Sequence, residues 1–220
     1  MCPESALGNL DHGTHLCSIY RDKNEQLSSV LSYIKGGLFR GDKIISILTE
    51  GTRSIFVKTL SDLGLELEKC REWGQFIFID DKEFYLGQGC FDPDRIIQMV
   101  TQEQNNAAMS GYKGVRGIAE MDCFLSRAPG TEKLIEYESN LNYFFPGSRL
   151  TSICHYREDL FDEDTLLGVL YTHPKAIIYG KLYDNHYYIP PEQFPARLKD
   201  GSIPGTYRLL RDTLIAQGPL

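Results

Sequence analysis

The sequence predicts an α/β fold: a mainly parallel sheet of about five strands flanked by helices, with a small C-terminal β-hairpin and helix as an appendage. Short apolar segments alternate along the chain with longer segments whose apolar residues recur at helical spacing. The apolar segments are continuous rather than alternating, as in parallel strands that are covered on both faces. Strictly alternating strands and helices require crossover connections, which place helices on both faces of one sheet.

The core of this prediction is five strands joined by four helices. In the first helix Leu27, Leu31 and Ile34 share one face, and Thr52 is placed to cap the second. Pro93 suits the first turn of the third, and Pro-Gly pairs bound the fourth. The expected strands are residues 15–20, 43–48, 75–80, 115–121 and 150–156; the expected helices are residues 24–39, 53–63 with a further turn or two at 66–73, 92–110 and 131–145.

After the fifth strand the pattern changes. A short helix is expected over residues 164–171, followed by two edge or hairpin strands at residues 176–179 and 185–189, and by a terminal helix at residues 207–215. We therefore divide the chain into a flexible N-terminus (residues 1–11), one α/β domain (residues 12–191) and a C-terminal extension (residues 192–220), a linker or terminal helix.

Composition narrows the class of protein. The chain has 220 residues and a formal net charge of −7, which argues against direct nucleic-acid binding because that needs clustered Lys and Arg. No apolar run approaches the roughly 20 residues that span a bilayer, and the N-terminus lacks the pattern of a secretion signal. The six cysteines are scattered without a CxxC pair. We expect a cytoplasmic protein with reduced thiols and no membrane partner.

The turn after the first strand contains no glycine. In a βα-repeat protein this turn is the natural phosphate cradle, because backbone N–H groups at a helix N-terminus bind anions when small residues allow close approach. Here the bulky, charged residues 21–25 fill it, with no Gly-Lys-Ser/Thr. We therefore expect no ATP binding and predict no cofactor, and the turn points to sensing and not to ATP hydrolysis.

Ligands of open α/β sheets bind beyond the carboxyl ends of the strands. The residues at or next to those ends combine aromatic rings, carboxylates, sulfur and imidazole, which suit a small organic molecule better than a triphosphate. The candidate ligand-binding residues are His15, Cys17, Tyr20, Glu50, Glu120, Met121, Cys123, Cys154, His155 and Tyr156. No residue is assigned to catalysis or to a metal.

Each candidate also has a structural interpretation. His15 and Cys17 share one strand face, and a buried Cys beside a hydrogen-bonded His is common in protein cores. Cys154 and His155 point to opposite faces, so at most one of them meets a given partner. Glu50 and Glu120 are equally suited to cap the next helix. No cysteine follows a helix-opening elbow, which argues against a cysteine hydrolase.

Two resemblances to known families follow from these motifs. The broader one is to RecA-like ATPases of the KaiC type, with Thr49-Glu50 in the place of an acidic pair and residues 115–120 in the place of the Walker B strand. Residues 21–25 occupy the place of the missing glycine-rich loop, so ATP binding is not carried over. If the strand order follows this core, the fifth strand lies between the first and the fourth. His15 or Cys17, Cys154 or His155, and residues 120–123 would then converge.

The closer resemblance is to the MEDS (methanogen/methylotroph, DcmR sensory) domain family. The His-x-Cys-x-x-Tyr motif is His15 to Tyr20, and a Glu-Met turn is followed by Pro-Gly and by Tyr-Glu-x-x-Leu-Asn at residues 137–142. Further matches are Cys154 and Tyr156, residues 172–174 and residues 185–191, so the likeness covers about residues 12–191. Asp122-Cys123 and His186 depart from the pattern.

This resemblance implies a non-catalytic sensor of small hydrocarbon or one-carbon derivatives that acts in signal transduction or transcription regulation. The implied partners are a small organic ligand and a histidine kinase or DNA-binding effector domain; we also consider a homodimer. The alternative is a metal, haem or redox sensor that uses the Cys and His residues. Further alternatives are a residual enzyme and an interaction module that uses exposed aromatics near Tyr183, Tyr187, Tyr188 and Phe194.

Overall fold

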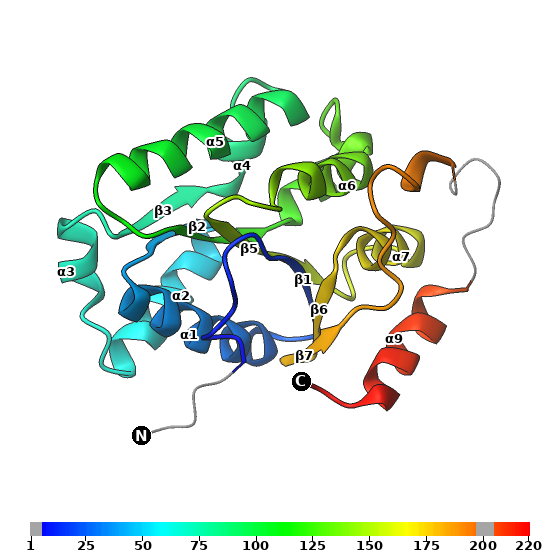
Figure 1. Ribbon diagram of the computed structural model, residues 1–220, viewed down its shortest axis with the longest axis horizontal. Coiled ribbons are helices and arrows are strands. Elements are labelled where there is room, and N and C mark those ends of the chain that lie inside the picture. The colour runs from blue at the N-terminus through cyan, green and yellow to red at the C-terminus, as the bar shows by residue number, and fades with distance from the viewer. Residues whose placement is uncertain (1–5, 197–204) are drawn as a thin grey trace.

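A computed structural model describes residues 6–196 and 205–220, and shows a seven-stranded sheet between two layers of helices (Figure 1). The strand order is β3-β2-β4-β5-β1-β6-β7, and every neighbouring pair is parallel except β6–β7. The fifth strand therefore lies between the first and the fourth, as predicted. The strands are β1 (His15–Tyr20), β2 (Lys43–Leu48), β3 (Phe76–Asp80), β4 (Val115–Glu120), β5 (Leu150–Arg157), β6 (Lys175–Ile178) and β7 (Lys181–Asp184).

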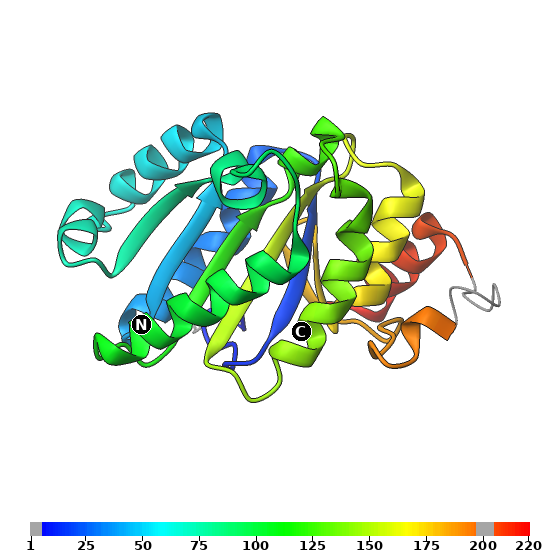
Figure 2. The ribbon, with the colours of Figure 1, turned by 90° about the horizontal axis from the view of Figure 1, so that it is seen from above.

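The helices divide between the two faces of the sheet (Figures 1 and 2). One face is covered by α1 (Lys23–Arg40), α2 (Glu50–Asp62) and α3 (Leu67–Glu72), which share an apolar core with Leu16, Ile118 and Ile153 of the strands. The other face carries α4 (Asp81–Leu86), α5 (Pro93–Met109), α6 (Leu134–Phe144), α7 (Glu163–Thr172) and α9 (Tyr207–Gln217), with the short helices η1 (Asp122–Ser126) and η2 (Thr131–Lys133). We call these the α1 face and the α6 face.

Strand register decides which side chains reach each face. In β1 and β5 Cys17 lies opposite Cys154 and Leu16 opposite Ile153, and successive residues point to opposite faces. Odd-numbered residues of β1 and even-numbered residues of β5 therefore point to the α6 face.

The C-terminal strands extend the main sheet instead of forming a separate appendage. β6 pairs in parallel with β1, and β7 is antiparallel to β6. The second strand ends at Asp184, not over residues 185–189 as predicted, because Tyr179 (φ 52°) and Gly180 (φ 81°) make a two-residue turn with positive φ at both positions. The expected exposed aromatic patch is wrong for Tyr183 and Phe194, which are buried.

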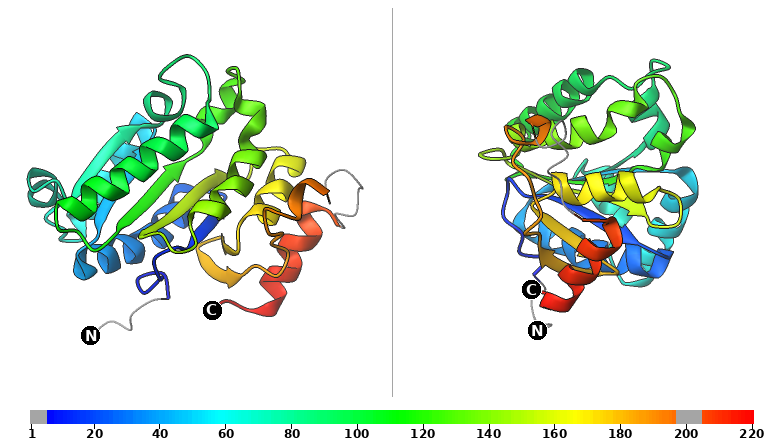
Figure 3. Two further views of the ribbon diagram at one scale, coloured as in Figure 1. Left: turned by 45° about the horizontal axis from the view of Figure 1, so that its top comes forward. Right: turned by 90° about the vertical axis from the view of Figure 1, so that its right-hand side faces the viewer.

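The predicted terminal helix is present as α9, and it packs against α7 (Figure 3). Tyr207, Leu210 and Leu214 bury its inner face. Residues 197–204 of the expected extension lie outside the described residues. Among the residues that are described, no helix is both long and apolar enough to cross a lipid bilayer.

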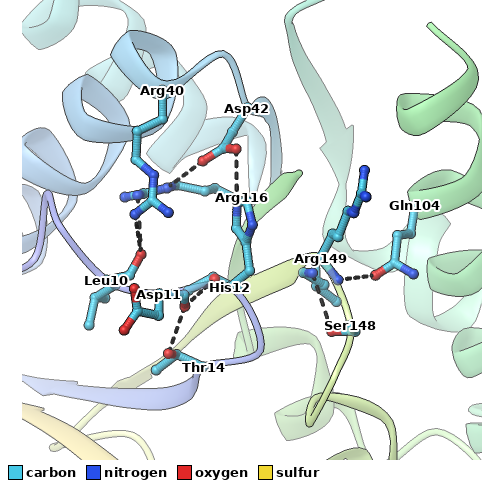
Figure 4. Close-up of polar contacts among 12 residues, drawn as sticks. Leu10, Asp11, His12, Thr14, Arg40, Asp42, Gln104, Arg116, Ser148 and Arg149 are labelled. Carbon is cyan, nitrogen blue, oxygen red and sulfur yellow. Dashed lines mark hydrogen bonds and ion pairs between the residues drawn. The ribbon is translucent and has the colours of Figure 1, made fainter. Parts of the chain in front are cut away.

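The N-terminal segment is packed from residue 6 onward, in contrast to the flexible segment predicted for residues 1–11; residues 1–5 lie outside the described part. Leu7 and Leu10 are buried. The guanidinium of Arg116, itself fully buried on β4, donates to the carbonyl oxygen of Gly8 at 3.0 Å. Arg40 donates to the Leu10 carbonyl at 2.8 Å (Figure 4). These contacts of Arg116 and Arg40 could not be predicted from the sequence, because they join residues that are far apart in the chain.

Asp42 neutralises the buried arginine. Its Oδ2 accepts from Arg116 Nε at 3.1 Å, and its Oδ1 lies 2.9 Å from His12 Nε2 (Figure 4). Both members of the Asp42–Arg116 pair are fully buried. A buried cation that loses its only carboxylate partner keeps its desolvation cost. Breaking this pair is therefore expected to lower the free energy of unfolding more than breaking an exposed pair does.

We predict that Asp42→Ala lowers the free energy of unfolding by about 3–5 kcal/mol, because it leaves the Arg116 charge buried and unpaired. Urea unfolding at pH 7 measures this. The matched control is Glu68→Ala, which breaks the exposed Arg71–Glu68 pair and should change stability by less than about 0.5 kcal/mol. Equal effects of the two variants would contradict the assigned role of Asp42.

Candidate functional site

The ten candidate residues do not form one pocket. His15, Cys17, Cys154 and Tyr156 point to the α6 face, where Met121 and Cys123 are also buried. Tyr20, Glu120 and His155 lie on the α1 face. Glu50 is exposed in the first turn of α2, 3.7 Å from Arg53. The convergence expected at the carboxyl edge is therefore replaced by two separate groups, because the strand period sends neighbouring residues to opposite sides of the sheet.

On the α6 face a buried polar cluster joins β1, β5, α6 and the residue after α7. We call it the inner polar cluster: His15, Glu138, Cys154 and His173. His15 Nε2 lies 3.2 Å from Glu138 Oε2 and 3.6 Å from Cys154 Sγ. His173 Nε2 lies 3.4 Å from the same carboxylate oxygen.

Two of these residues were missed from the sequence. Glu138 stands in the Tyr-Glu-x-x-Leu-Asn motif, but its helix was not placed against the first strand. His173 lies in the matched residues 172–174 but is not among the candidate residues. The i, i+4 spacing of Glu138 and Asn142 was the available signal, because it puts both on one face of α6.

The charge of Glu138 dominates the electrostatics of this cluster. Burial by itself would raise the pKa of this carboxyl group, but the adjacent His15 and His173 side chains hold the pKa well below its usual range. The Tyr156 hydroxyl donates to Glu138 Oε1 at 2.5 Å. Burial and the neighbouring carboxylate raise the pKa of Tyr156 well above its usual value. Side chains from β1, β5 and the residue after α7 thus converge on the ionised Glu138 of α6.

The cysteines of this face are protonated thiols. Burial and the Glu138 charge raise the pKa of both Cys17 and Cys154, and burial with the nearby carboxylates of Asp81 and Asp122 raises that of Cys123. Because the thiolate is the reactive form, none of the three is a nucleophile in this state.

An apolar cavity of about 60 Å³ adjoins the inner polar cluster. It lies between the sheet and helices α4, α5 and α6, and it has room for a molecule of a few heavy atoms. Cys154 belongs to both features, and Phe145, which lines the cavity, stacks on His15 with ring centroids 4.5 Å apart. The lining residues are Ile45, Ile47, Ile79, Phe84, Tyr85, Val100, Glu103, Val115, Gly117, Ala119, Tyr137, Leu141, Phe145, Leu150, Ser152 and Cys154.

On the α1 face Glu120 is the centre of a second buried group. Its carboxylate accepts from Lys23 Nζ at 3.0 Å, from Thr52 Oγ1 at 2.8 Å and from the Thr49 backbone N–H at 3.0 Å. Burial opposes ionisation, yet Lys23 and the hydrogen bonds from Thr49 and Thr52 lower the pKa of Glu120 below its usual value. Glu120 therefore ties the first turns of α1 and α2 to the end of β4.

The first turn of α1 is closed to an outside anion by the protein's own carboxylates. Asp22 accepts from the backbone N–H groups of Asn24 and Glu25 at 2.8 and 3.0 Å. Glu25 accepts from the backbone N–H of Arg21 at 2.8 Å. A phosphate at this helix end would meet occupied donors and two negative charges.

Beyond this carboxylate network lie Tyr20, His155 and Asp122. The rings of Tyr20 and His155 meet edge to face with centroids 6.0 Å apart. Burial lowers the pKa of His155 to about 4 against the opposing effect of Glu120, so this imidazole is neutral at pH 7. Burial and the Glu120 charge raise the pKa of Asp122 to about 6. Neither His155 ring nitrogen nor Asp122 Oδ1 has a hydrogen-bond partner among the described residues.

Comparison with known proteins identifies this architecture. The family model of MEDS, the methanogen/methylotroph, DcmR sensory domain, matches residues 14–174. The transcriptional repressor DcmR of Methylorubrum extorquens is 23% identical over 169 residues, which are 75% of this chain and 60% of that protein. The chain thus spans about 60% of the length of this relative.

Two solved structures share the fold. A KaiC-like protein from Pyrococcus horikoshii OT3 superposes with a TM-score of 0.52 and 14% identity over 76% of this chain and 71% of that one. The flagellar accessory protein FlaH from Methanocaldococcus jannaschii gives a TM-score of 0.51 and 12% identity over 80% and 77%. At these identities the likeness establishes the fold alone. Both predicted resemblances, to MEDS and to the KaiC-type RecA-like fold, are confirmed.

We predict that Asp122→Asn raises the free energy of unfolding at pH 7 by about 1–2 kcal/mol. The folded-state pKa of about 6 lies above the usual value, so ionisation of Asp122 penalises the folded state increasingly between pH 4 and pH 6. The stabilisation by Asn should therefore vanish below pH 4. Urea unfolding of both proteins at pH 4 and pH 7 measures this; a pH-independent difference would contradict the assigned burial of the charge.

Proposed function

The chain belongs to the MEDS family, and we propose that it is a cytoplasmic sensory domain that binds a small, uncharged one-carbon or hydrocarbon derivative in the apolar cavity under α4, α5 and α6. The family is described as sensory and the matched relative is a transcriptional repressor, which supports a regulatory sensory role. The observation that carries the ligand class is the size and apolar lining of the cavity.

The chemistry of the lining selects among one-carbon compounds. Aliphatic and aromatic side chains dominate the wall, and its one charged residue, Glu103, is paired with Lys43 at 3.3 Å. A methylammonium ion would lose its hydration there without a free counter-charge, so it should bind poorly. A halogenated methane or a short hydrocarbon derivative loses little on entry and fills apolar space.

Binding would reach an effector through α6. This helix lines the cavity with Tyr137 and Leu141, and it holds Glu138 against His15 and His173. A ligand that favours one packing of α6 over another shifts the equilibrium between them by the difference in its affinity for the two. The output we propose is control of transcription, through a DNA-binding or histidine-kinase partner.

A non-catalytic role is part of the proposal. It is supported by the protonated state of the buried thiols and by the carboxylates of Asp22 and Glu25 at the place where a nucleotide phosphate would bind. Lys23, the lysine in the first turn of α1, is engaged by Glu120 at 3.0 Å.

We predict that a halogenated methane raises the melting temperature of the protein, whereas methylammonium does not. Ala119→Leu, which replaces a methyl group of the cavity wall by an isobutyl group, should abolish the shift. Differential scanning fluorimetry and titration calorimetry measure both.

The matched control is Ile118→Leu, a volume-conserving change. Ile118 precedes Ala119 in β4 and points to the α1 face. This variant should keep the ligand-induced shift. Absence of binding across uncharged one-carbon compounds, or binding that survives Ala119→Leu, would contradict the proposed ligand site.

Millimolar Mg·ATP should leave the melting temperature unchanged. A site with a Kd of about 0.1 mM would add about 1.4 kcal/mol at 1 mM nucleotide, which thermal unfolding resolves. A shift of that size would show that the Asp22 and Glu25 carboxylates move aside, and would argue for nucleotide-dependent function.

A further inference from the structure

We propose that the inner polar cluster binds one divalent transition-metal ion of the Zn²⁺ class. Its four side chains are buried, and their donor atoms lie within 4.8 Å of one another. Imidazole, thiolate and carboxylate are the ligand types that Zn²⁺ takes in proteins. The inference goes beyond the small-molecule site: the two share Cys154, but the other three ligands do not line the apolar cavity.

The hydrogen bonds around His15 fix which of its nitrogens carries the proton. Asn142 Nδ2 donates to the carbonyl oxygens of Glu138 and Thr172 at 3.0 and 2.7 Å, so its Oδ1 is the atom that faces His15 Nδ1, 3.2 Å away. The assignment from these partners places the proton on Nδ1. The Nε2 lone pair of His15 therefore points toward Glu138 and Cys154.

His173 is arranged in the same way. Its Nδ1 lies 2.8 Å from the Val169 carbonyl oxygen, which can only accept, so Nδ1 carries the proton and Nε2 presents its lone pair. That lone pair faces Glu138 Oε2 at 3.4 Å. Neither His173 Nε2 nor Glu138 Oε2 has a hydrogen-bond partner within residues 6–196 and 205–220.

Two imidazole lone pairs and a carboxylate oxygen thus face one another in a region closed to water. With both imidazoles neutral this arrangement is repulsive, so the Glu138 charge needs either protons on the two Nε2 atoms or a cation between the donor atoms. A metal ion at the centre would be coordinated by all three lone pairs.

Three of the six donor separations agree with tetrahedral coordination, and all six lie within 4.8 Å. Bond lengths of about 2.0–2.1 Å to nitrogen or oxygen and about 2.3 Å to sulfur give edges of about 3.3 Å between N/O ligands and about 3.6 Å between nitrogen and sulfur. The observed His15–Glu138 and His173–Glu138 separations are 3.2 and 3.4 Å. The His15–Cys154 separation is 3.6 Å.

Charge and outer contacts also suit a divalent ion. When the metal–sulfur bond forms, the Cys154 thiol releases its proton to solvent, and one thiolate with one carboxylate balances the two positive charges. Each imidazole is oriented by an acceptor on its other nitrogen, and Tyr156 donates to the remaining oxygen of Glu138. Four protein ligands leave no open position, which is typical of a structural or sensory metal and not of a catalytic one.

The test begins with the full chain, produced without chelators and analysed for metal by mass spectrometry, followed by refolding in the presence of Co²⁺. We expect about one equivalent of metal per chain. The Co²⁺ form should show the intense visible bands of tetrahedral cobalt together with a near-ultraviolet thiolate-to-cobalt charge-transfer band.

Cys154→Ser should remove the charge-transfer band and weaken Zn²⁺ binding by more than about 100-fold, beyond the cost of losing an outer contact. Cys17→Ser is the matched control, because Cys17 shares the same strand face and burial but lies outside the inner polar cluster. It should keep the band.

Two results would overturn the proposal. One is folded wild-type protein that takes up neither Zn²⁺ nor Co²⁺ in stoichiometric amount, which would mean that protons on the imidazoles balance Glu138. The other is a cobalt spectrum of octahedral type that Cys154→Ser does not alter. The wild-type measurements decide these outcomes even if a variant fails to fold, and neither depends on the small-molecule ligand.

Discussion

The buried carboxylate of Glu138 is the constraint around which the α6 face is organised. It is fully buried, yet it is held in the ionised form by side chains from β1, β5 and the end of α7. An ion in such a place is costly, and removing any of its partners leaves part of that cost uncompensated. The arrangement therefore fixes the position of α6 relative to the sheet more narrowly than apolar packing alone would.

Three further carboxylates surround the start of α1 in this RecA-like fold. Asp22 and Glu25 satisfy the backbone donors at the start of α1, and Glu120 binds the lysine of that turn. The protein's own carboxylates thus close the start of α1 to an outside anion. On the opposite face the apolar cavity adjoins the inner polar cluster, because Cys154 belongs to both and Phe145 of the cavity wall stacks on His15.

Much of the fold was predictable from local patterns. The five core strands are continuous apolar runs, and caps such as Asp92 before Pro93 mark where the helices begin. The parity of β1 also placed His15 and Cys17 on one face, and that of β5 separated Cys154 from His155. These features depend on the alternation of side chains along a strand and on the residue types at helix ends, and both can be read from a single sequence.

The rest depended on contacts between distant residues. Arg116 anchors the N-terminal segment, and Glu138 meets His15 across more than half of the chain. Neither contact has a local signal. The candidate list joined Glu120 and Cys154 in one pocket because the expected strand order makes their strands neighbours, whereas β4 and β5 present them to opposite faces. The turn at Tyr179 and Gly180 has positive φ at both positions, and a tyrosine is not the residue expected in such a turn. The bounds predicted for the last strand therefore differ from those observed.

The central claim is that sensing takes place on the α6 face and not at the first turns of α1 and α2. The most direct test is an amide chemical-shift map of the ¹⁵N-labelled protein titrated with a halogenated methane. The account predicts that the perturbed amides cluster around Ala119, Leu141 and Cys154. Perturbations concentrated at residues 21–25 and 49–52, with the α6 face unchanged, would contradict it.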